Sequence, residues 1–146
     1  MRYYCILLLT IFTSCKATQD LVEIKYITNT LKAWTYIPEG FKKEIIESGQ
    51  DIEYRFVYND SSMIYITDEK GTPTLNYKNI ENDSSSLQKS FLSLMENDTL
   101  TLHGKDNLGK FWKNKKLKEL SIGYLNVNEN QKIVFDKAIS LIKIKQ

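Results

Sequence analysis

The sequence predicts an α+β fold in which one antiparallel sheet of five to six strands packs against two or three helices. Short runs of alternating apolar and polar residues, clearest at 51–59, predict strands. Apolar residues at helical spacing in 83–96 and 128–144 predict helices. Because the two kinds of segment do not alternate regularly along the chain, α+β is favoured over a doubly wound parallel sheet.

The first part of the folded region is predicted to hold two extended segments and a short helix. Residues 21–27 alternate loosely and form either an edge strand or more of a tether. Residues 33–37 are expected to be extended, since Pro38 disfavours helix at the preceding residue. Residues 39–48 predict a short helix with three large apolar side chains on one side, ended by Gly49.

A hairpin follows. Residues 51–59 alternate strictly between the two faces, 59–62 are turn residues, and 63–67 return as a second strand. A further turn is expected at 68–73, followed by a weak third strand at 74–80.

The second half is predicted to contain a helix, three strands and a final helix, at 83–96, 99–103, 109–112, 120–127 and 128–144. The strands at 99–103 and 109–112 flank a turn. Asn128 and Gln131 have the spacing of a capping box that starts the last helix. Its apolar face is expected to hold Val134, Ala138, Leu141 and Ile142, with Phe135 and Ile139 alongside.

The N-terminus has the pattern of an export signal. Arg2 precedes the apolar run 3–12, which is shorter than the roughly 20 residues that span a bilayer. Thr13 and Ser14 then lead to Cys15. This arrangement resembles bacterial lipoprotein signals, and the resemblance implies that Cys15 is acylated and becomes the mature N-terminus. Ordinary secretion and an uncleaved anchor fit less well.

The predicted organisation follows from this signal. Residues 1–14 are the signal peptide, 15–20 a tether and 21–146 a single α+β domain. The domain is expected in the cell envelope, held by lipid to a bacterial membrane, the outer membrane first among them. Cys5 would leave with the signal and Cys15 would carry lipid, so no thiol would remain for a disulfide, a nucleophile or a metal.

Charge is distributed unevenly along the chain. Residues 16–98 hold 9 basic and 14 acidic side chains, whereas 99–146 hold 10 basic and 4 acidic ones. Either the C-terminal half provides a basic surface, or the two halves neutralise each other across one fold.

The segment 104–110 matches the phosphate-loop pattern G-x-x-x-x-G-K, but it is interpreted as a hairpin turn. Phe111 stands where Mg²⁺ coordination needs a Ser or Thr hydroxyl. No helix start follows, although a phosphate loop opens a helix. No nucleotide or other cofactor is therefore expected.

No catalytic or metal-ligating residue is assigned. His103 is the only histidine and has neither a G-x-S-x-G elbow nor a second histidine at ligand spacing. Asp68 with Glu69, or Asp51 with Glu53, could serve glycoside hydrolysis, but their contexts predict solvated surface. A glycan hydrolase is therefore the alternative function, and an immunity or inhibitor protein is a third.

Cations and aromatic residues are interleaved in the second half. The candidate partner-contact residues are Lys105, Lys110, Trp112, Lys113, Lys115 and Lys116. Because export makes nucleic acid an unexpected partner, another envelope protein or an anionic envelope polymer is favoured. The other interpretation is a solvated face with Trp112 packed in the core.

Residues 104–127, GKDNLGKFWKNKKLKELSIGYLNV, and the final helix are similar to small uncharacterised lipoproteins of Flavobacterium-like Bacteroidota. The similarity implies a single mature domain and an envelope location, but no activity, substrate or cofactor. The function expected from the sequence is a lipid-anchored, non-enzymatic binding or accessory domain.

Overall fold

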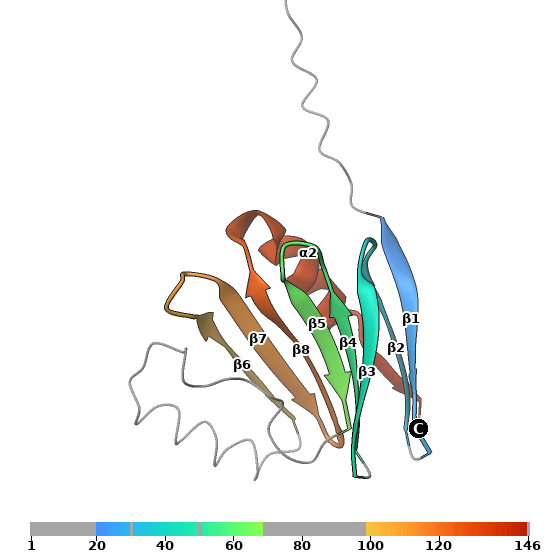
Figure 1. The fold of residues 1–146 in the computed structure, drawn as a ribbon. Coiled ribbons are helices and arrows are strands. Elements are labelled where there is room, and N and C mark those ends of the chain that lie inside the picture. The colour runs from blue at the N-terminus through green and yellow to red at the C-terminus, as the bar shows by residue number, and fades with distance from the viewer. Residues whose placement is uncertain (1–19, 30, 50, 69–98, 146) are drawn as a thin grey trace, which may run out of the picture.

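The computed structural model describes residues 20–29, 31–49, 51–68 and 99–145, which hold nine strands and one helix (Figure 1). The coarse class expected from the sequence is confirmed, since most of this part of the chain is antiparallel sheet with a helix packed against it. The predicted signal at 1–14, Cys15, the strand at 74–80 and the helix at 83–96 lie outside the described residues. A second helix therefore stays a prediction.

The strands form two sheets rather than the single one expected. The larger is antiparallel throughout, in the order β3-β4-β5-β8-β7-β6. Its strands are β3 (Lys42–Ser48), β4 (Asp51–Val57), β5 (Met63–Thr67), β8 (Leu120–Val127), β7 (Phe111–Leu117) and β6 (Thr99–Lys105). The predicted hairpin at 51–67 is confirmed as β4 and β5.

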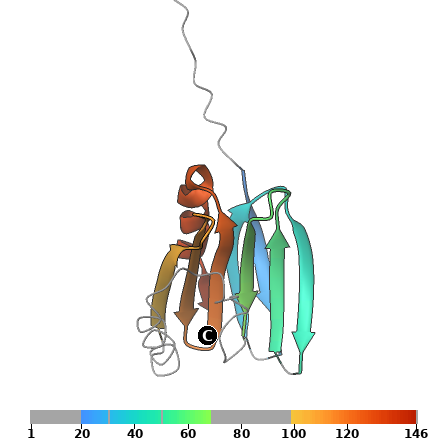
Figure 2. The same cartoon turned by 60° about the vertical axis from the view of Figure 1, so that its left-hand side comes forward.

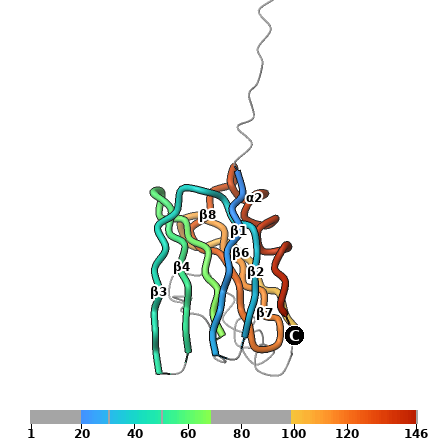
Figure 3. The backbone as a smooth tube through the Cα atoms, turned by 90° about the vertical axis from the view of Figure 1, so that its right-hand side faces the viewer, coloured from blue at the N-terminus to red at the C-terminus, as the bar shows by residue number. Residues whose placement is uncertain are grey.

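The smaller sheet and the helix make a second layer. The sheet has the order β1-β2-β9, with β1 (Leu21–Ile27), β2 (Lys32–Pro38) and the short β9 (Lys143–Lys145). The helix α2 (Glu129–Ser140) packs beside it and contacts β2, β8 and β7. Figures 2 and 3 show this layer covering one face of the six-stranded sheet, which we call the inner face.

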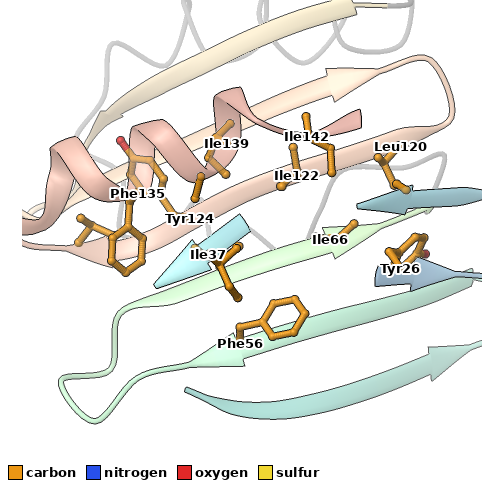
Figure 4. Close-up of a cluster of buried hydrophobic side chains, with 14 of the residues drawn as sticks. Tyr26, Ile37, Phe56, Ile66, Leu120, Ile122, Tyr124, Phe135, Ile139 and Ile142 are labelled. Carbon is orange, nitrogen blue, oxygen red and sulfur yellow. The ribbon is translucent and has the colours of Figure 1, made fainter. Parts of the chain in front are cut away.

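The hydrophobic core lies between the two layers (Figure 4). The register of the large sheet places Ile64 beside both Phe56 and Tyr124, and Ile66 beside Ile122. All five side chains are at most 1% exposed. Burying such side chains supplies about 1.5–3 kcal/mol each, so this interface provides most of the driving force for folding.

The final helix is shorter than predicted. Its start is as expected, because Gln131 Oε1 accepts a hydrogen bond from the Asn128 backbone N–H at 3.3 Å in a capping box. It ends at Ser140, however, and 143–145 instead pair with β2 as β9. The buried stripe consists of Phe135, Ala138, Ile139 and Ile142, whereas Val134 and Leu141 are only partly buried.

The predicted short helix at 39–48 is wrong, because residues 42–48 form the edge strand β3. Each residue from Lys42 to Ser48 pairs with one on β4, and Gly49 turns the chain with φ +66°. Ile45 and Ile46 are 52% and 37% exposed. Without a core to bury a helical stripe, pairing with the strong strand β4 decides the conformation of this segment.

Hydrogen bonds show which loops share one end of the molecule. β1 starts there, since Asp20 accepts a hydrogen bond from Glu39, the residue after β2. Tyr58 Oη donates to the Pro38 carbonyl at 2.8 Å, and Gln131 Nε2 donates to Asp60 Oδ2 at 2.8 Å. The β4–β5 turn and the start of α2 therefore lie at the end where the chain enters β1, which we call the tether end.

The hydrogen bonds to Asp60 stabilise its charged form. Burial opposes ionisation, but the bonds that Ser62 and Gln131 donate outweigh it and hold the pKa of Asp60 below its usual value. The β6–β7 turn lies at the same end, since Lys110 Nζ donates to Asn128 Oδ1. Within the described residues, no helix is long and apolar enough to cross a membrane.

Candidate functional site

The inner face of the large sheet extends beyond the helix that covers it. Along β6 and β7 the register pairs His103 with Lys113 and Lys105 with Phe111. Lys113 contacts α2, so all four side chains belong to the inner face. Because α2 packs over β8 and β7, the β6 side chains beyond it, His103 and Lys105, remain exposed.

We call the part of the inner face that β6 and β7 form beyond α2 the ledge. A cleft of about 290 Å³ lies between α2 and the ledge. We call it the β6–β7–α2 cleft. It is lined by His103, Gly104, Lys105, Phe111, Trp112, Lys113, Tyr124, Lys132 and Asp136. Strands β6, β7 and β8 supply one wall and the helix supplies the other.

Asp136 is the only carboxylate among the described residues that line the cleft, and three donors hold it. Its Oδ1 accepts from Lys113 Nζ at 2.8 Å and from Tyr124 Oη at 3.1 Å. Its Oδ2 accepts from Lys132 Nζ at 2.6 Å, one helical turn away. These contacts join α2 to β7 and β8.

The network stabilises the charged carboxylate. Burial opposes ionisation of Asp136, but the hydrogen bonds from Lys113 and Lys132 outweigh it and hold the pKa of Asp136 below its usual value. Burial and the neighbouring negative charge raise the pKa of Tyr124, so its phenol stays protonated and donates. Neither group is poised to exchange a proton near neutral pH.

Phe111 forms an aromatic surface at the cleft, and cations lie over it. Lys105 Nζ is 4.4 Å and Lys132 Nζ 5.6 Å from the ring centroid. Both distances fall within the range of cation–π attraction. Lys105 is also 3.8 Å from Glu129, but these side chains are 56% and 79% exposed, so this ion pair is weak.

The cleft carries an excess of positive charge. Lys105, Lys113 and Lys132 bring three ammonium groups to the lining, which holds the single carboxylate of Asp136, and Lys113 and Lys132 contact it directly. The exposed Glu129, next to Lys105, offsets this charge only in part. An excess of positive charge in a concave, half-shielded space attracts anions more strongly than the same charges on a flat surface. The arrangement is suited to binding an anion, and it supplies no nucleophile paired with a base.

The structure divides the predicted partner-contact residues between different surfaces. Lys105 and Lys113 line the cleft, and Lys115 lies on the same face of β7. Lys110 lies in the β6–β7 turn. Although Trp112 borders the cleft, the alternation of β7 directs its side chain and that of Lys116 towards the opposite face. The six residues therefore do not form one continuous patch.

Trp112 is buried, as the alternative interpretation expected, with 7% of its surface exposed. Its indole packs on Gly104 of the neighbouring strand, where an added Cβ would lie 3.0 Å from the ring. That packing lies outside the cluster between the two layers.

The resemblance of 104–110 to a phosphate loop is explained by a hairpin turn, as predicted. Asp106 Oδ1 accepts hydrogen bonds from the backbone N–H groups of Leu108 and Lys110, and Gly109 has φ +74°. Phe111, the residue after this segment, starts strand β7 rather than a helix.

Of the carboxylates considered for hydrolysis, Glu69 lies outside the described residues, whereas Asp51, Glu53 and Asp68 lie away from the cleft, on β4 and directly after β5. Glu53 forms an ion pair with Arg55. Asp68 Oδ1 accepts a hydrogen bond from the Ile52 backbone N–H at 2.9 Å, so this carboxylate has a structural role at the start of β4. Across the described ranges, no three His, Cys, Asp or Glu side chains are grouped as metal ligands would be.

Sequence reasoning missed the helical half of the cleft. Lys132 and Asp136 are four residues apart, a spacing that predicts contact on one helix face. The sequence does not show that this face lies over β7, nor that Tyr124 reaches it from β8.

Comparisons of the chain with protein families, with curated proteins and with solved structures gave no match.

Proposed function

We propose that this chain is a lipid-anchored domain of a bacterial envelope, which binds an anionic envelope component through the β6–β7–α2 cleft and the adjoining ledge. The lipid would be attached at Cys15, and the domain would act by binding rather than by catalysis. The observation that supports binding is the excess of ammonium groups around one carboxylate in the cleft.

The position of the tether end is compatible with this role. The chain enters β1 at Asp20, only five residues after Cys15. Five residues reach at most about 18 Å when fully extended. An acylated Cys15 would hold the domain close to the membrane, with the β6–β7 turn and the start of α2 at the end of the molecule where the tether begins.

The anchor is tested by fractionation and intact mass. In the native host or a close bacterial host, the wild-type chain should sediment with membranes and carry the mass of the acyl groups. Cys15→Ser should move to the soluble fraction and lack that mass. A wild-type chain that is soluble and unacylated would overturn the anchor.

Binding to the envelope is tested separately, by removing positive charge from the ledge. The variant Lys105→Gln/Lys113→Gln/Lys115→Gln should lose most of its retention on isolated envelope polymer at low salt. The matched control, Lys32→Gln/Lys143→Gln/Lys145→Gln, removes the same charge from the smaller sheet, where these residues are exposed. Equal retention of both variants would show that the cleft and ledge do not carry the binding.

The alternative of glycan hydrolysis is not proposed, because Asp51, Glu53 and Asp68 do not converge on the cleft. The residues of the cleft likewise give no specific support to an immunity or inhibitor role.

A further inference from the structure

We propose that the β6–β7–α2 cleft is a phosphate site, which binds a phosphomonoester group carried by a small molecule or a headgroup. This inference deepens the proposed function, because it names the chemical group that the tethered domain would recognise. The cations that would bind the group come from three elements: Lys105 from β6, Lys113 from β7 and Lys132 from α2.

The number and placement of the ammonium groups favour a phosphomonoester over a carboxylate. Asp136 offsets one of the three ammonium charges and the exposed Glu129 pairs weakly with Lys105, which leaves an excess of between one and two. A phosphomonoester carries about −1.5 to −2 at neutral pH, whereas a carboxylate carries only one negative charge. A phosphate also offers several acceptor oxygens, so ammonium groups on two walls can contact it at once.

The three lysines of the cleft differ in how far their side chains are exposed to solvent. Lys113 is 23% exposed, Lys132 37% and Lys105 56%. Lys113 is held mainly as a fixed positive charge, while Lys105 and Lys132 reach the open side of the cleft. The imidazole of His103 on β6 is exposed and lies beside Lys113 of β7, where it is a further hydrogen-bonding group at the rim of the cleft.

The size of the cleft limits the ligand. A volume of about 290 Å³ is just below the usual range for ligand pockets, roughly 300–1,000 Å³. It accommodates a phosphate with one attached ring or short chain. Phe111 provides the apolar surface on which such a ring can lie, next to the two ammonium groups above it.

Asp136 acts in this arrangement as an internal competitor. Its carboxylate already engages Lys113 and Lys132, and a bound phosphate must share those ammonium groups with it. Neutralising Asp136 should therefore strengthen phosphate binding, although it weakens the contact between α2 and the sheet. A purely structural ion pair would not produce this gain in affinity.

Calorimetric titration tests the assignment. The mature acylated chain is placed in nanodiscs of phosphatidylcholine and titrated at low ionic strength with phenyl phosphate, inorganic phosphate and benzoate. Phenyl phosphate should bind most tightly, inorganic phosphate more weakly and benzoate weakest. Benzoate equal to phenyl phosphate, or no saturable binding of either phosphate, would overturn the proposal.

Three variants make the test specific to the cleft. Lys105→Gln/Lys132→Gln should weaken phenyl phosphate by about tenfold or more, as expected when charged hydrogen bonds are lost. Lys32→Gln/Lys143→Gln, with the same change in net charge, should bind within about twofold of wild type, since neither residue lines the cleft and this control corrects for the change in net charge. Asp136→Asn should bind roughly threefold more tightly or better.

Circular dichroism checks that each variant is folded. If Lys105→Gln/Lys132→Gln does not fold, the single variant Lys105→Gln replaces it in the titration. Equal weakening in the cleft variant and the matched control would overturn the site. So would an Asp136→Asn protein that is folded but binds phenyl phosphate more weakly than wild type.

Changing the lipid composition of the nanodisc distinguishes a lipid headgroup from a soluble molecule as the source of the bound phosphate. In discs that contain phosphatidic acid, a lipid headgroup in the cleft would lower the apparent affinity for phenyl phosphate more than discs of equal surface charge made with the phosphodiester phosphatidylglycerol do. An equal affinity in these two kinds of disc would assign the site to soluble phosphates, and either result supports the phosphate assignment. If the chain proves unacylated, the titration is done without discs, so failure of the anchor and failure of the phosphate site remain separate.

Discussion

The Tyr124 hydroxyl of β8 donates a hydrogen bond to Asp136 Oδ1 on α2, at 3.1 Å. This bond sits where the core meets the cleft, because the Tyr124 ring packs against Phe135 in the core while its hydroxyl reaches the polar network. The same two residues thus help to hold the helix on the sheet and to set the charge of the candidate site. Several measurable properties depend on this region.

Asp136→Asn should lower the free energy of unfolding at neutral pH by about 1–3 kcal/mol, because charged hydrogen bonds to Lys113 and Lys132 are lost. The loss should depend on pH. The pKa of Asp136 is depressed in the folded state. Its contribution is therefore fully present above the unfolded-state pKa of about 3.9 and disappears as pH falls through the lower folded-state pKa.

Urea unfolding of wild type and Asp136→Asn at several pH values checks this prediction. The stability difference should be constant between about pH 5 and pH 7 and should shrink below about pH 4. Asp60, whose pKa is also lowered, is present in both proteins and cancels in the difference. A difference that stays the same down to the acid transition would contradict the account.

Gly123→Ala should destabilise the fold severely. An added Cβ would lie 2.2 Å from Tyr65 Oη and 2.4 Å from the Lys113 carbonyl oxygen, and the carbonyl belongs to a neighbouring central strand that cannot easily move. We expect a loss of about 3 kcal/mol or more.

Gly104→Ala is the matched control for that change. Gly104 lies on the edge strand β6, and the three atoms nearest to its added Cβ would all belong to the Trp112 side chain, at 3.0–3.1 Å. The expected loss is about 1 kcal/mol, since the indole can shift. Thermal melting of both variants should rank Gly123→Ala as clearly the less stable, and the reverse order would show that the β7–β8 packing is described wrongly.

Thr35→Val should cost about 1–2 kcal/mol in chemical denaturation. Thr35 Oγ1 donates to the Ala138 carbonyl at 2.7 Å, inside the contact between β2 and α2, and both residues are fully buried. Valine keeps the shape but leaves that carbonyl without this donor. Thr101→Val, on the exposed side of β6, should change stability by less than about 0.5 kcal/mol. Equal effects of the two substitutions would contradict the assigned contact.

Local patterns predicted much of the fold. The alternation in 51–59 gave the hairpin because both strands lie in the centre of the large sheet, where alternation reflects burial. Asn128 and Gln131 located the start of α2, since a capping box depends only on neighbouring residues. The turn at 106–110 was predictable for the same reason.

Long-range pairing accounts for the errors. Residues 39–48 have apolar residues at spacings that a helix can use, but β4 pairs with them along their length as β3. Residues 143–145 leave the helical pattern because β2 offers them a strand partner more than a hundred residues earlier in the chain. The division into two sheets depends on which faces meet, and no local pattern carries that information.

The candidate site was predictable only in part. Lys105 and Lys113 were singled out because cations and aromatic residues are interleaved there, whereas Trp112 and Lys116 were grouped with them although alternation along β7 separates the two sets. Lys132 and Asp136 were not found, because their contribution depends on how α2 lies over the sheet.

The most direct test of the central claim, that this domain binds an anionic envelope component through the β6–β7–α2 cleft, is site-specific photo-crosslinking in intact cells. A photoreactive amino acid is placed at His103, on the rim of the cleft, or at Tyr36, which is 41% exposed on the smaller sheet. The account predicts adducts with a phosphate-bearing envelope component from position 103 and none from position 36. Adducts from position 36 alone, or from neither position, would contradict it.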